Sequence, residues 1–478
     1  MKKLNQQDRG FLMLLALVFG SIFFTLLAAL ASFSITQNHV QTAATGKAKG
    51  LALAEAGLEY YRWHLEHFPG DLQNGTGHSG PYVITENDPE GGTNGTVTLD
   101  ITGNQSCGQV TSIDITATGK PSDGSDTSRT IEARYAQPTV AQYSYILNDS
   151  VWAGADRVIN GPYHSNGGIR MDGTANAPVT SSLSSWTCTS DFGCDGGWFG
   201  WSYPTEPGVF GDGSNSDLWK YPTPQVDFSG IAADFSALKT KAQTSGLYFA
   251  RYSSGSSNGS AYWKGYHLTF NSNGTVTVKR VTSVQSVSVQ PINPADSSTD
   301  HTLIRNETTL GTYTVPSDCG LIYVEDNAWI DGILSKKVTV VAANVVNSGV
   351  SPNIMLPDNI TYTDSSAGLT AIAENDVLVT GNSPNTMNLS GVFIAQGGAF
   401  GRNYYGCPSS YEPRGTLTIH GTTVSNKRTG TKWQDGCWNG DAGYQTRIDA
   451  YDRTLSTDPP PFTPSISSDY QFVDWREK

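Results

Sequence analysis

The chain has 478 residues, enough for two or three domains, and carries a formal net charge of −13. This charge argues against affinity for nucleic acid or for an anionic membrane surface as a property of the whole protein. Charged residues make up only 15% of the chain, whereas glycine occurs 51 times. That profile favours an extracellular, β-rich protein with many turns over a helical cytosolic enzyme.

The N-terminus has a short basic head followed by a long apolar run. The run extends from Phe11 to Ile35 without a charged residue. It exceeds the roughly 20 residues that span a bilayer, and it is longer than the ~7–15-residue apolar region of a cleavable signal. The basic residues Lys2, Lys3 and Arg9 place the N-terminus in the cytoplasm by the positive-inside rule.

The helix predicted for this run continues well beyond it. Five apolar residues recur at the three- and four-residue spacing of one helical face: Leu51, Ala54, Leu58, Tyr61 and Leu65. No proline interrupts residues 11–68, and Pro69–Gly70 follows. We therefore expect a single helix over residues 11–68, about 85 Å long. Its first half is apolar on all sides, and its second half is amphipathic.

Two features of this segment resemble type IV pilins. Arg9–Gly10 before Phe11 is similar to a prepilin peptidase site, and AEAGL at residues 54–58 resembles a motif of the PilX-type minor pilins. The resemblance covers residues 1–137. It implies a leader of residues 1–10, cleavage after Gly10, and Phe11 as the methylated N-terminus. It also implies three partners: prepilin peptidase, the inner membrane before assembly, and other pilins contacted through the helix.

The sequence departs from the major pilins at one position. Major pilins carry a glutamate at the fifth mature position, which pairs with the N-terminal amine of a neighbour, but here that position is Leu15. A carboxylate in lipid is costly unless it is paired, so Leu15 removes both the docking contact and its cost. The resemblance therefore implies an initiating, tip or sparse subunit, or a pilin-like protein that stays in the membrane.

Residues 69–137 are predicted to form a small antiparallel sheet. Four runs alternate apolar with polar residues and end at Gly, Asn or Pro: PYVITEN, GTVTLDITGN, VTSIDITATGK and SRTIEARYAQP. The amphipathic half of the helix needs such a cover. We place the end of this pilin-like cap at residue 137.

Residues 138–478 contain short repeats at irregular intervals. Three units share an aliphatic residue, a glycine two positions later and a terminal Asn or Gln: residues 159–166, 389–396 and 419–426. Short strands broken at Gly or Asn suit the rungs of a parallel β-helix, with a β-sandwich as the alternative. The predicted fold is thus mainly β with one long N-terminal α-helix, in which a pilin-like α+β head precedes a parallel β-helix-like body.

Two parts of this body are expected to depart from the repeats. The region of about 218–318 resembles an insertion, with a helix capped by Asp227 or Ser229 and then Thr/Val-rich strands. The tail cannot be regular through its prolines. We expect the tail aromatic residues, Tyr470, Phe472 and Trp475, to hold it on the body as a strap.

The six cysteines suggest two disulfides. Cys188 and Cys194 bracket a tight loop, and Cys407 and Cys437 bracket another. Both pairs are expected to be oxidised if the body is exported, whereas free buried thiols are the alternative. Cys107 and Cys319 have no evident partner.

An aromatic segment surrounds Cys188 and Cys194. Exposed Trp and Tyr side chains stack on sugars and anchor protein interfaces. The candidates for binding a surface glycan, or a host or abiotic surface, are Trp198, Trp201 and Tyr203. The alternative is a loop cluster that packs on itself.

No catalytic, metal-binding or cofactor-binding pattern stands out, and we do not expect an enzyme. Acidic residues are scattered at predicted turns: Asp172, Asp331, Asp358 and Asp376. The predicted function is a minor type IV pilin, or a pilin-like surface protein, that presents its body for pilus assembly or adhesion. It would cross the inner membrane once and then reach the pilus or cell surface. One alternative is a membrane-tethered enzyme on polysaccharide, which would need carboxylates that converge. Another is a signal-anchored structural protein.

Overall fold

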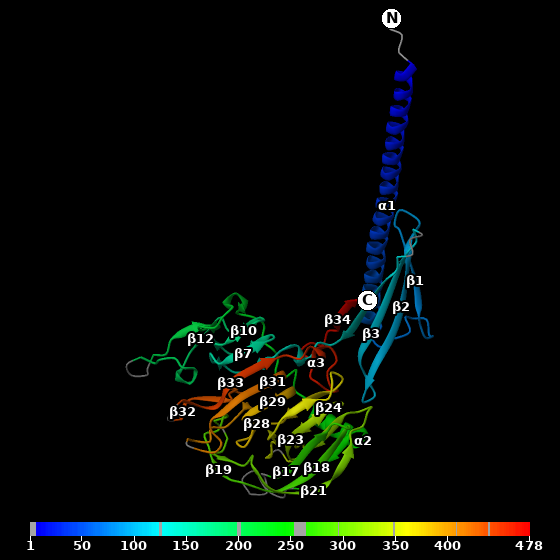
Figure 1. The fold of residues 1–478 in the computed structure, drawn as a ribbon. Coiled ribbons are helices and arrows are strands. Elements are labelled where there is room, and N and C mark those ends of the chain that lie inside the picture. The colour runs from blue at the N-terminus through cyan, green and yellow to red at the C-terminus, as the bar shows by residue number, and fades with distance from the viewer. Residues whose placement is uncertain are drawn as a thin grey trace. The chain divides into compact units, whose positions relative to one another are not determined.

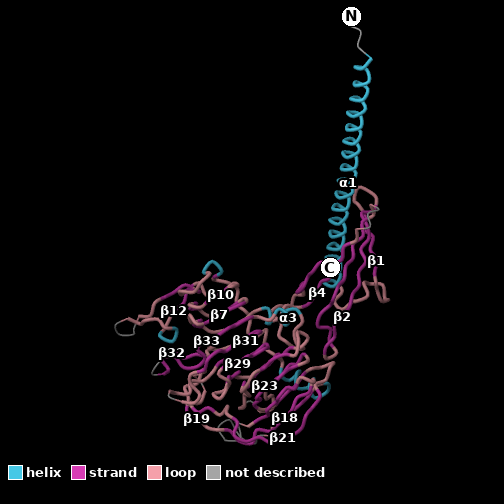
Figure 2. Tube along the Cα trace, in the orientation of Figure 1, coloured by secondary structure: helices cyan, strands magenta, loops and turns pink. Residues whose placement is uncertain are grey.

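The computed structural model describes residues 6–123, 127–197, 202–252, 264–294, 296–347, 349–407, 409–437 and 440–478. In these ranges the fold is mainly β with one long N-terminal helix, as predicted (Figures 1 and 2). The chain divides into two compact units. The head unit comprises Met1–Asn104, Ile113–Tyr135 and Asp474–Lys478, and the body unit comprises Gln105–Ser112 and Ala136–Val473.

Helix α1 (Gln6–His67) is continuous because its sequence contains no proline. It ends just before Pro69 and Gly70, whose φ of +84° cannot continue a helix. Among the described residues, α1 is the helix long and apolar enough to cross a membrane, and none of its most apolar window is buried. The side chains between Phe11 and Ile35 that would face lipid are therefore exposed in the isolated chain.

The second half of α1 packs against the head sheet. Its buried face consists of Leu53, Ala54, Leu58, Tyr61 and Leu65. Leu53 takes the place expected for Leu51, which is only half-buried. Gly57 of the AEAGL stretch permits the close approach, because a Cβ there would lie 2.3 Å from Cγ1 of Val97.

The head sheet has five strands rather than the four predicted. Their order is β1 (Tyr82–Asn87), β2 (Thr93–Ser106), β3 (Gln109–Pro121), β4 (Arg129–Ala136) and β34 (Gln471–Glu477). The tail lies on the body as expected before it reaches β34, because Phe462 and Ile466 pack against the body core and Thr339 donates to the carbonyl oxygen of Pro461. It then ends in a strand of the head sheet, so the expectation that the tail aromatic residues hold it on the body is wrong. Charge pairing explains the placement, because Glu132 on β4 binds both Arg476 and Lys478 at 2.7 Å. The tail aromatic residues Tyr470 and Trp475 remain exposed.

The body unit is a parallel β-helix and not a β-sandwich. Its first sheet stacks ten strands in parallel. They are β16 (Leu247–Phe249), β22 (Leu321–Val324), β24 (Lys337–Ala342), β27 (Gly368–Ala373), the C-terminal parts of β29 (Thr386–Ala395) and β31 (Arg414–Ser425), β5 (Tyr145–Leu147), β8 (Tyr163–Ser165), β11 (Val179–Ser181) and β15 (Trp219–Lys220).

Two further parallel sheets lie beside the first, and the short strands β6 (Val151–Ala153), β9 (Ile169–Met171) and β14 (Val209–Phe210) form a separate parallel sheet. The second contains β23 (Asn327–Leu334), β25 (Ile354–Leu356), β28 (Val377–Val379) and β30 (Phe400–Gly401). The third runs from the end of β23 through β26 (Ile360–Tyr362), the N-terminal parts of β29 and β31, β33 (Gly440–Ala450) and β7 (Arg157–Asn160) to β10 (Thr174–Ala175). Aliphatic side chains from all three sheets fill the core between them.

The short repeats of the sequence are stacked rungs. Leu389 pairs with Ile419 and Gly391 with Gly421, so two of the units lie in register. A Cβ on Gly421 would lie 2.0 Å from the carbonyl oxygen of Gly391, which explains the glycine at this corner.

The final amides of the repeats form a column at another corner. Asn166 Nδ2 donates to Asn148 Oδ1, and Asn148 Nδ2 donates to Asn426 Oδ1, both at 2.8 Å. Gln396 and Asn426 follow directly after the last register pair of β29 and β31, Ala395 with Ser425. These amides also bind residues 221–234, the return segment, which leads from β15 to α2. Val226 N donates to Asn166 Oδ1 at 2.9 Å, and Ala233 N donates to Gln396 Oε1 at 2.8 Å.

The rungs do not follow the order of the chain. β5 pairs with β31 and β7 pairs with β33, so the first rung of the body stacks on its last strands. The return segment then leads to α2 (Phe235–Ser245) and β16. Asp234 caps α2 by accepting from Ala237 N at 3.0 Å, so the predicted caps Asp227 and Ser229 are wrong.

The region predicted as an insertion, about residues 218–318, contains rungs as well as additions. β16 and β17 (Gly265–Asn271) pair in parallel with β22 and β23. Outside the rungs, β18 (Thr275–Val284) joins β17 and β21 (Ile304–Thr314) in antiparallel pairing.

A buried ion pair lies where the first rung meets the last strands. Arg157 Nε on β7 donates to Asp449 Oδ2 on β33 at 2.6 Å, and Tyr145 OH donates to Asp449 Oδ1 at 3.1 Å. The Arg157 guanidinium also lies 4.3 Å from the ring centre of Tyr145. This junction joins strands almost 300 residues apart in the sequence.

Asp449→Asn removes the charge that compensates the buried Arg157. We expect the free energy of unfolding of the body to fall by about 3–5 kcal/mol, measured by urea unfolding of the full chain. Asp191→Asn is the matched control, because that carboxylate is 73% exposed and 4.0 Å from Arg428. It should change stability very little. Equal losses in the two variants would contradict the role of the buried pair.

Candidate functional site

The predicted processing residues lie on an exposed part of α1. Phe11 is 68% exposed, and a Cβ built on Gly10 meets no atom within 4 Å. Of the predicted ligand-binding residues, Trp198 and Trp201 lie outside the described residues. Tyr203 is half-buried, and its hydroxyl donates to Ser190 Oγ at 3.2 Å.

Three disulfides are present in the described structure. They join Cys188 to Cys194 and Cys407 to Cys437, the two pairs expected from the sequence, and also Cys107 to Cys319. The third bond was missed because its cysteines are 212 residues apart. Cys107 and Cys319 both belong to the body unit, since the tip of the β2–β3 hairpin, Gln105–Ser112, is part of that unit.

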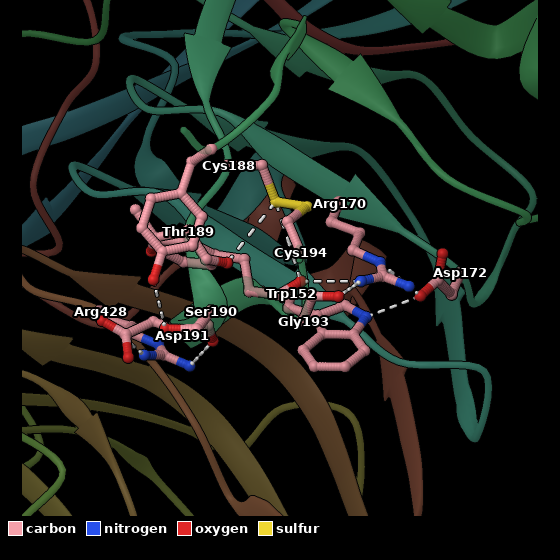
Figure 3. Close-up of a disulfide and its surroundings, with 12 residues drawn as sticks. Trp152, Arg170, Asp172, Cys188, Thr189, Ser190, Asp191, Gly193, Cys194 and Arg428 are labelled. Atoms are coloured by element: carbon pink, nitrogen blue, oxygen red, sulfur yellow. Dashed lines mark hydrogen bonds and ion pairs between the residues drawn. A yellow bond between two sulfur atoms is a disulfide. The ribbon is translucent and has the colours of Figure 1, made fainter. Parts of the chain in front are cut away.

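Two arginines, Arg170 and Arg428, hold the Cys188–Cys194 loop in place, and Arg428 donates to the carbonyl oxygen of Asp191 (Figure 3). Arg170 Nη1 donates to the carbonyl oxygens of Phe192 at 2.9 Å and Gly193 at 2.8 Å. Its guanidinium also lies 4.4 Å from the ring centre of Trp152. Asp172 completes the cluster by accepting from Arg170 Nε at 2.9 Å and from Trp152 Nε1 at 2.7 Å.

The described aromatic residues beside this loop pack on one another. The Trp186 ring centre lies 5.0 Å from that of Phe192 and 5.9 Å from that of Phe210. Trp186 is only 8% exposed. The Arg428 guanidinium lies 4.8 Å from the ring centre of Phe192. This part of the segment is therefore a small disulfide-tied core, which matches the alternative considered for the sequence. Of the predicted contact residues, Tyr203 lies beside it.

The acidic residues singled out in the sequence do not meet. Asp172 belongs to the loop cluster, Asp358 is exposed, and Asp331 and Asp376 join two other networks. Among the residues that the structure describes, no group of three or more His, Cys, Asp or Glu side chains is placed to hold a metal ion.

Asp331 belongs to a network around His267. The two ring nitrogens of His267 lie 2.8 Å from Glu307 Oε2 and 2.8 Å from Asp331 Oδ2, and Lys279 pairs with Glu307. Burial alone would lower the pKa of His267, but the two carboxylates outweigh burial and raise it. Burial likewise opposes ionisation of Glu307, yet Lys279 and His267 keep its pKa below the usual range. The network thus favours an imidazolium that joins β17, β21 and β23.

Asp376 is fully buried just before β28. Its carboxylate accepts from Ala399 N at 2.6 Å and from Asn375 Nδ2 at 2.9 Å. Burial, and then the neighbouring Asp296, raise the pKa of Asp376 well above its usual range. Glycosidases keep their two carboxylates roughly 5–9.5 Å apart, with the scissile bond between them. The Asp376 carboxylate is fully buried and bonded within the β-helix, which does not match that arrangement.

Together these features define a β-helix protein with a long apolar N-terminal helix and three disulfides. A scan against models of known protein families finds no match, and a search of curated proteins finds no relative. Among solved structures, the chain is similar to the competence-associated pilin ComZ from Thermus thermophilus at 13% sequence identity and a TM-score of 0.31. The match covers 91% of this chain and 98% of that one. A likeness at this level assigns neither fold nor function.

Gly193→Ala tests the docking of the Cys188–Cys194 loop. The new Cβ would lie 2.5 Å from the Trp152 ring and 2.6 Å from Arg170 Nη1, so the loop must shift. Hydrogen exchange of residues 188–194 should accelerate. Gly197→Ala is the control, because φ is +72° there against +74° at Gly193, with no atom within 4 Å. Both variants carry a similar backbone cost of about 1 kcal/mol, so equal exchange would refute the docking contact.

His267→Gln should lower stability in a pH-dependent way. The folded-state pKa of His267 is raised, so its contribution is complete below the unfolded pKa of about 6.5 and is lost as pH rises through the folded pKa. The difference in urea midpoint between wild type and variant should therefore shrink from pH 5 to pH 9. His420→Gln, at a half-exposed histidine, should give a small difference throughout. A constant difference for His267→Gln would refute the charged network.

Proposed function

We propose that the chain is a type IV pilin-like subunit that carries a large β-helical body outside the cell. The observation that carries the proposal is the division of α1 into two halves. The half before Ile35 exposes apolar side chains all round, whereas the half around Leu58 is buried against its own sheet. A plain membrane anchor has no need of the second half.

The first half of α1 would serve two roles in turn. It would hold the subunit in the inner membrane, where its length and hydropathy suit a single span. After cleavage by prepilin peptidase it would pack against the helices of other pilins. Both roles cover the same apolar surface, which is costly to leave in water.

The finer assignment is a minor subunit rather than a shaft subunit. Leu15 supports this assignment, because the chain has no carboxylate at that position to pair with the N-terminal amine of a neighbour. The three disulfides support an oxidising location for the body, which suits display at the pilus or cell surface.

Adhesion is the role we propose for the displayed body, with Trp198, Trp201 and Tyr203 as the contact residues for a surface glycan, or a host or abiotic surface. The support is compositional, because exposed Trp and Tyr stack on sugars. Tyr203 is also joined, through its bond to Ser190 Oγ, to the disulfide loop that Arg170 holds. We assign no catalytic residue, metal or cofactor.

The proposal predicts the mature N-terminus. Mass analysis of the protein from sheared surface filaments should find N-methylated Phe11, and Gly10→Val should leave Met1 in place. Gly20→Val is the matched control, because both glycines are helical and have no atom within 4 Å of an added Cβ. It should be processed normally. An intact Met1 in the wild type, or a start near Ser32, would overturn the pilin-like assignment.

A further inference from the structure

A pocket of about 470 Å³ lies beside α2, and we propose that it binds the carboxyl-terminal end of a partner polypeptide. Its volume is within the range of ligand sites, roughly 300–1,000 Å³. Three segments of the body unit line it: residues from 230 to 241, the tail residues 462–465, and Gln109 from the tip of the β2–β3 hairpin. This inference concerns the body alone and does not depend on the pilin-like function.

One wall of the pocket is a single face of α2. The pocket is lined there by four residues: Asp234, Ala237, Leu238 and Lys241. The last three follow the first by three, four and seven positions, which places all four in one row along the helix. Asp234 and Lys241 stand roughly 10 Å apart along the helix axis, and an extended peptide of about three residues covers that length. The wall thus has a carboxylate at one end, an ammonium group at the other, and apolar side chains between them.

The ammonium group of Lys241 is available for a ligand. Lys239, on the same helix, pairs with Glu325, whereas no carboxylate within the described residues pairs with Lys241. A Cβ on Gly108 would lie 3.7 Å from Lys241 Nζ, so this group lies at the hairpin-tip side of the pocket. At the other end, the side chain of Asp234 caps α2. These charges favour one direction of binding, with the carboxylate of the ligand at Lys241 and away from Asp234.

The middle of the pocket suits apolar side chains. Ile231 and Leu238 are buried residues of its lining and belong to the apolar core of the body. Phe462 stands on the tail side, and its φ of +60° is uncommon for a residue with a side chain. The tail is fixed beside it, because Thr339 donates to the carbonyl oxygen of Pro461. Backbone strain of this kind persists only where the surrounding structure imposes it, and it is frequent at ligand sites.

The tail side of the pocket also offers free backbone groups. Ser465 pairs with Thr139 in an antiparallel bridge whose two hydrogen bonds come from the neighbouring residues, at 2.9 and 3.0 Å. In this kind of pair the N–H and C=O of Ser465 itself point away from Thr139, and neither has a partner among the described residues. Because Ser465 lines the pocket, these groups can extend the pairing to a bound peptide strand.

The three features together select the class of ligand. A fatty acid would fit the apolar lining and Lys241, but it has no group that pairs with the backbone of Ser465. A peptide carboxyl terminus uses all three features. Its carboxylate accepts charge-assisted hydrogen bonds from Lys241, its side chains contact the apolar lining, and its backbone pairs with Ser465.

Isothermal titration calorimetry of the full chain in detergent tests the proposal. The probes are acetylated tripeptides that end in valine, leucine or phenylalanine with a free carboxylate. At least one should bind the wild type, and its C-terminal amide should bind about tenfold or more weakly. Lys241→Met should lower the affinity for the carboxylate form by a similar factor and should no longer distinguish it from the amide. Lys427→Met removes an exposed charge elsewhere on the body and should bind as the wild type does.

A second pair of variants tests the place of binding. Ala237→Trp fills the pocket from an exposed position on α2 and should abolish binding. Ser236→Trp adds the same side chain at the neighbouring exposed residue, which is outside the lining, and should bind as the wild type does. The urea midpoint of each variant separates loss of the pocket from loss of the fold.

Four results would overturn the proposal. All the tripeptides could fail to bind the wild type, or Lys241→Met could bind them as well as Lys427→Met does. Ala237→Trp could bind as well as Ser236→Trp does. The fourth result is binding of decanoate to the wild type but not to Ala237→Trp, without binding of any tripeptide. That result would assign the pocket to a fatty acid.

Discussion

The apolar surface of α1 before Ile35 is the constraint on which the rest of the protein depends. Apolar area exposed to water costs roughly 25 cal/mol per Å², and this half of the helix has no cover in its own chain. Lipid or other helices must supply one. The second half of the same helix solves the problem internally, because Leu58 and its neighbours are buried beneath the head sheet, with Gly57 allowing close approach. One continuous helix thus has two environments: its own sheet covers the second half, and lipid or other helices must cover the first.

The body depends on a different principle, the repetition of side chains along a parallel stack. Amides such as Asn148 and Asn166 bond to one another from rung to rung, and the same column supplies partners for the backbone of the return segment. The return segment is required because the first rung stacks on the last strands. At that junction the buried Arg157–Asp449 pair favours one register, since a misplaced strand would leave a buried charge unpaired.

Local patterns in the sequence were sufficient to predict α1, the alternating strands of the head and the rung repeats, because each depends on neighbours a few residues apart. Interactions over long separations were not predictable in this way. The Cys107–Cys319 bond, the pairing of β34 with β4 and the stacking of β5 on β31 join residues hundreds of positions apart. Asp376 looked like a turn residue in the sequence but is fully buried, because burial beside a rung depends on the tertiary structure.

The most direct test of the pilin-like account is to identify what covers the first half of α1 after assembly. A photo-reactive diazirine amino acid at Phe24, which is 72% exposed in the isolated chain, would be activated in intact filaments and the products identified by mass spectrometry. The account predicts a covalent adduct with the N-terminal helix of another pilin subunit. Adducts with lipid alone, or a mature chain that lacks residue 24, would contradict it.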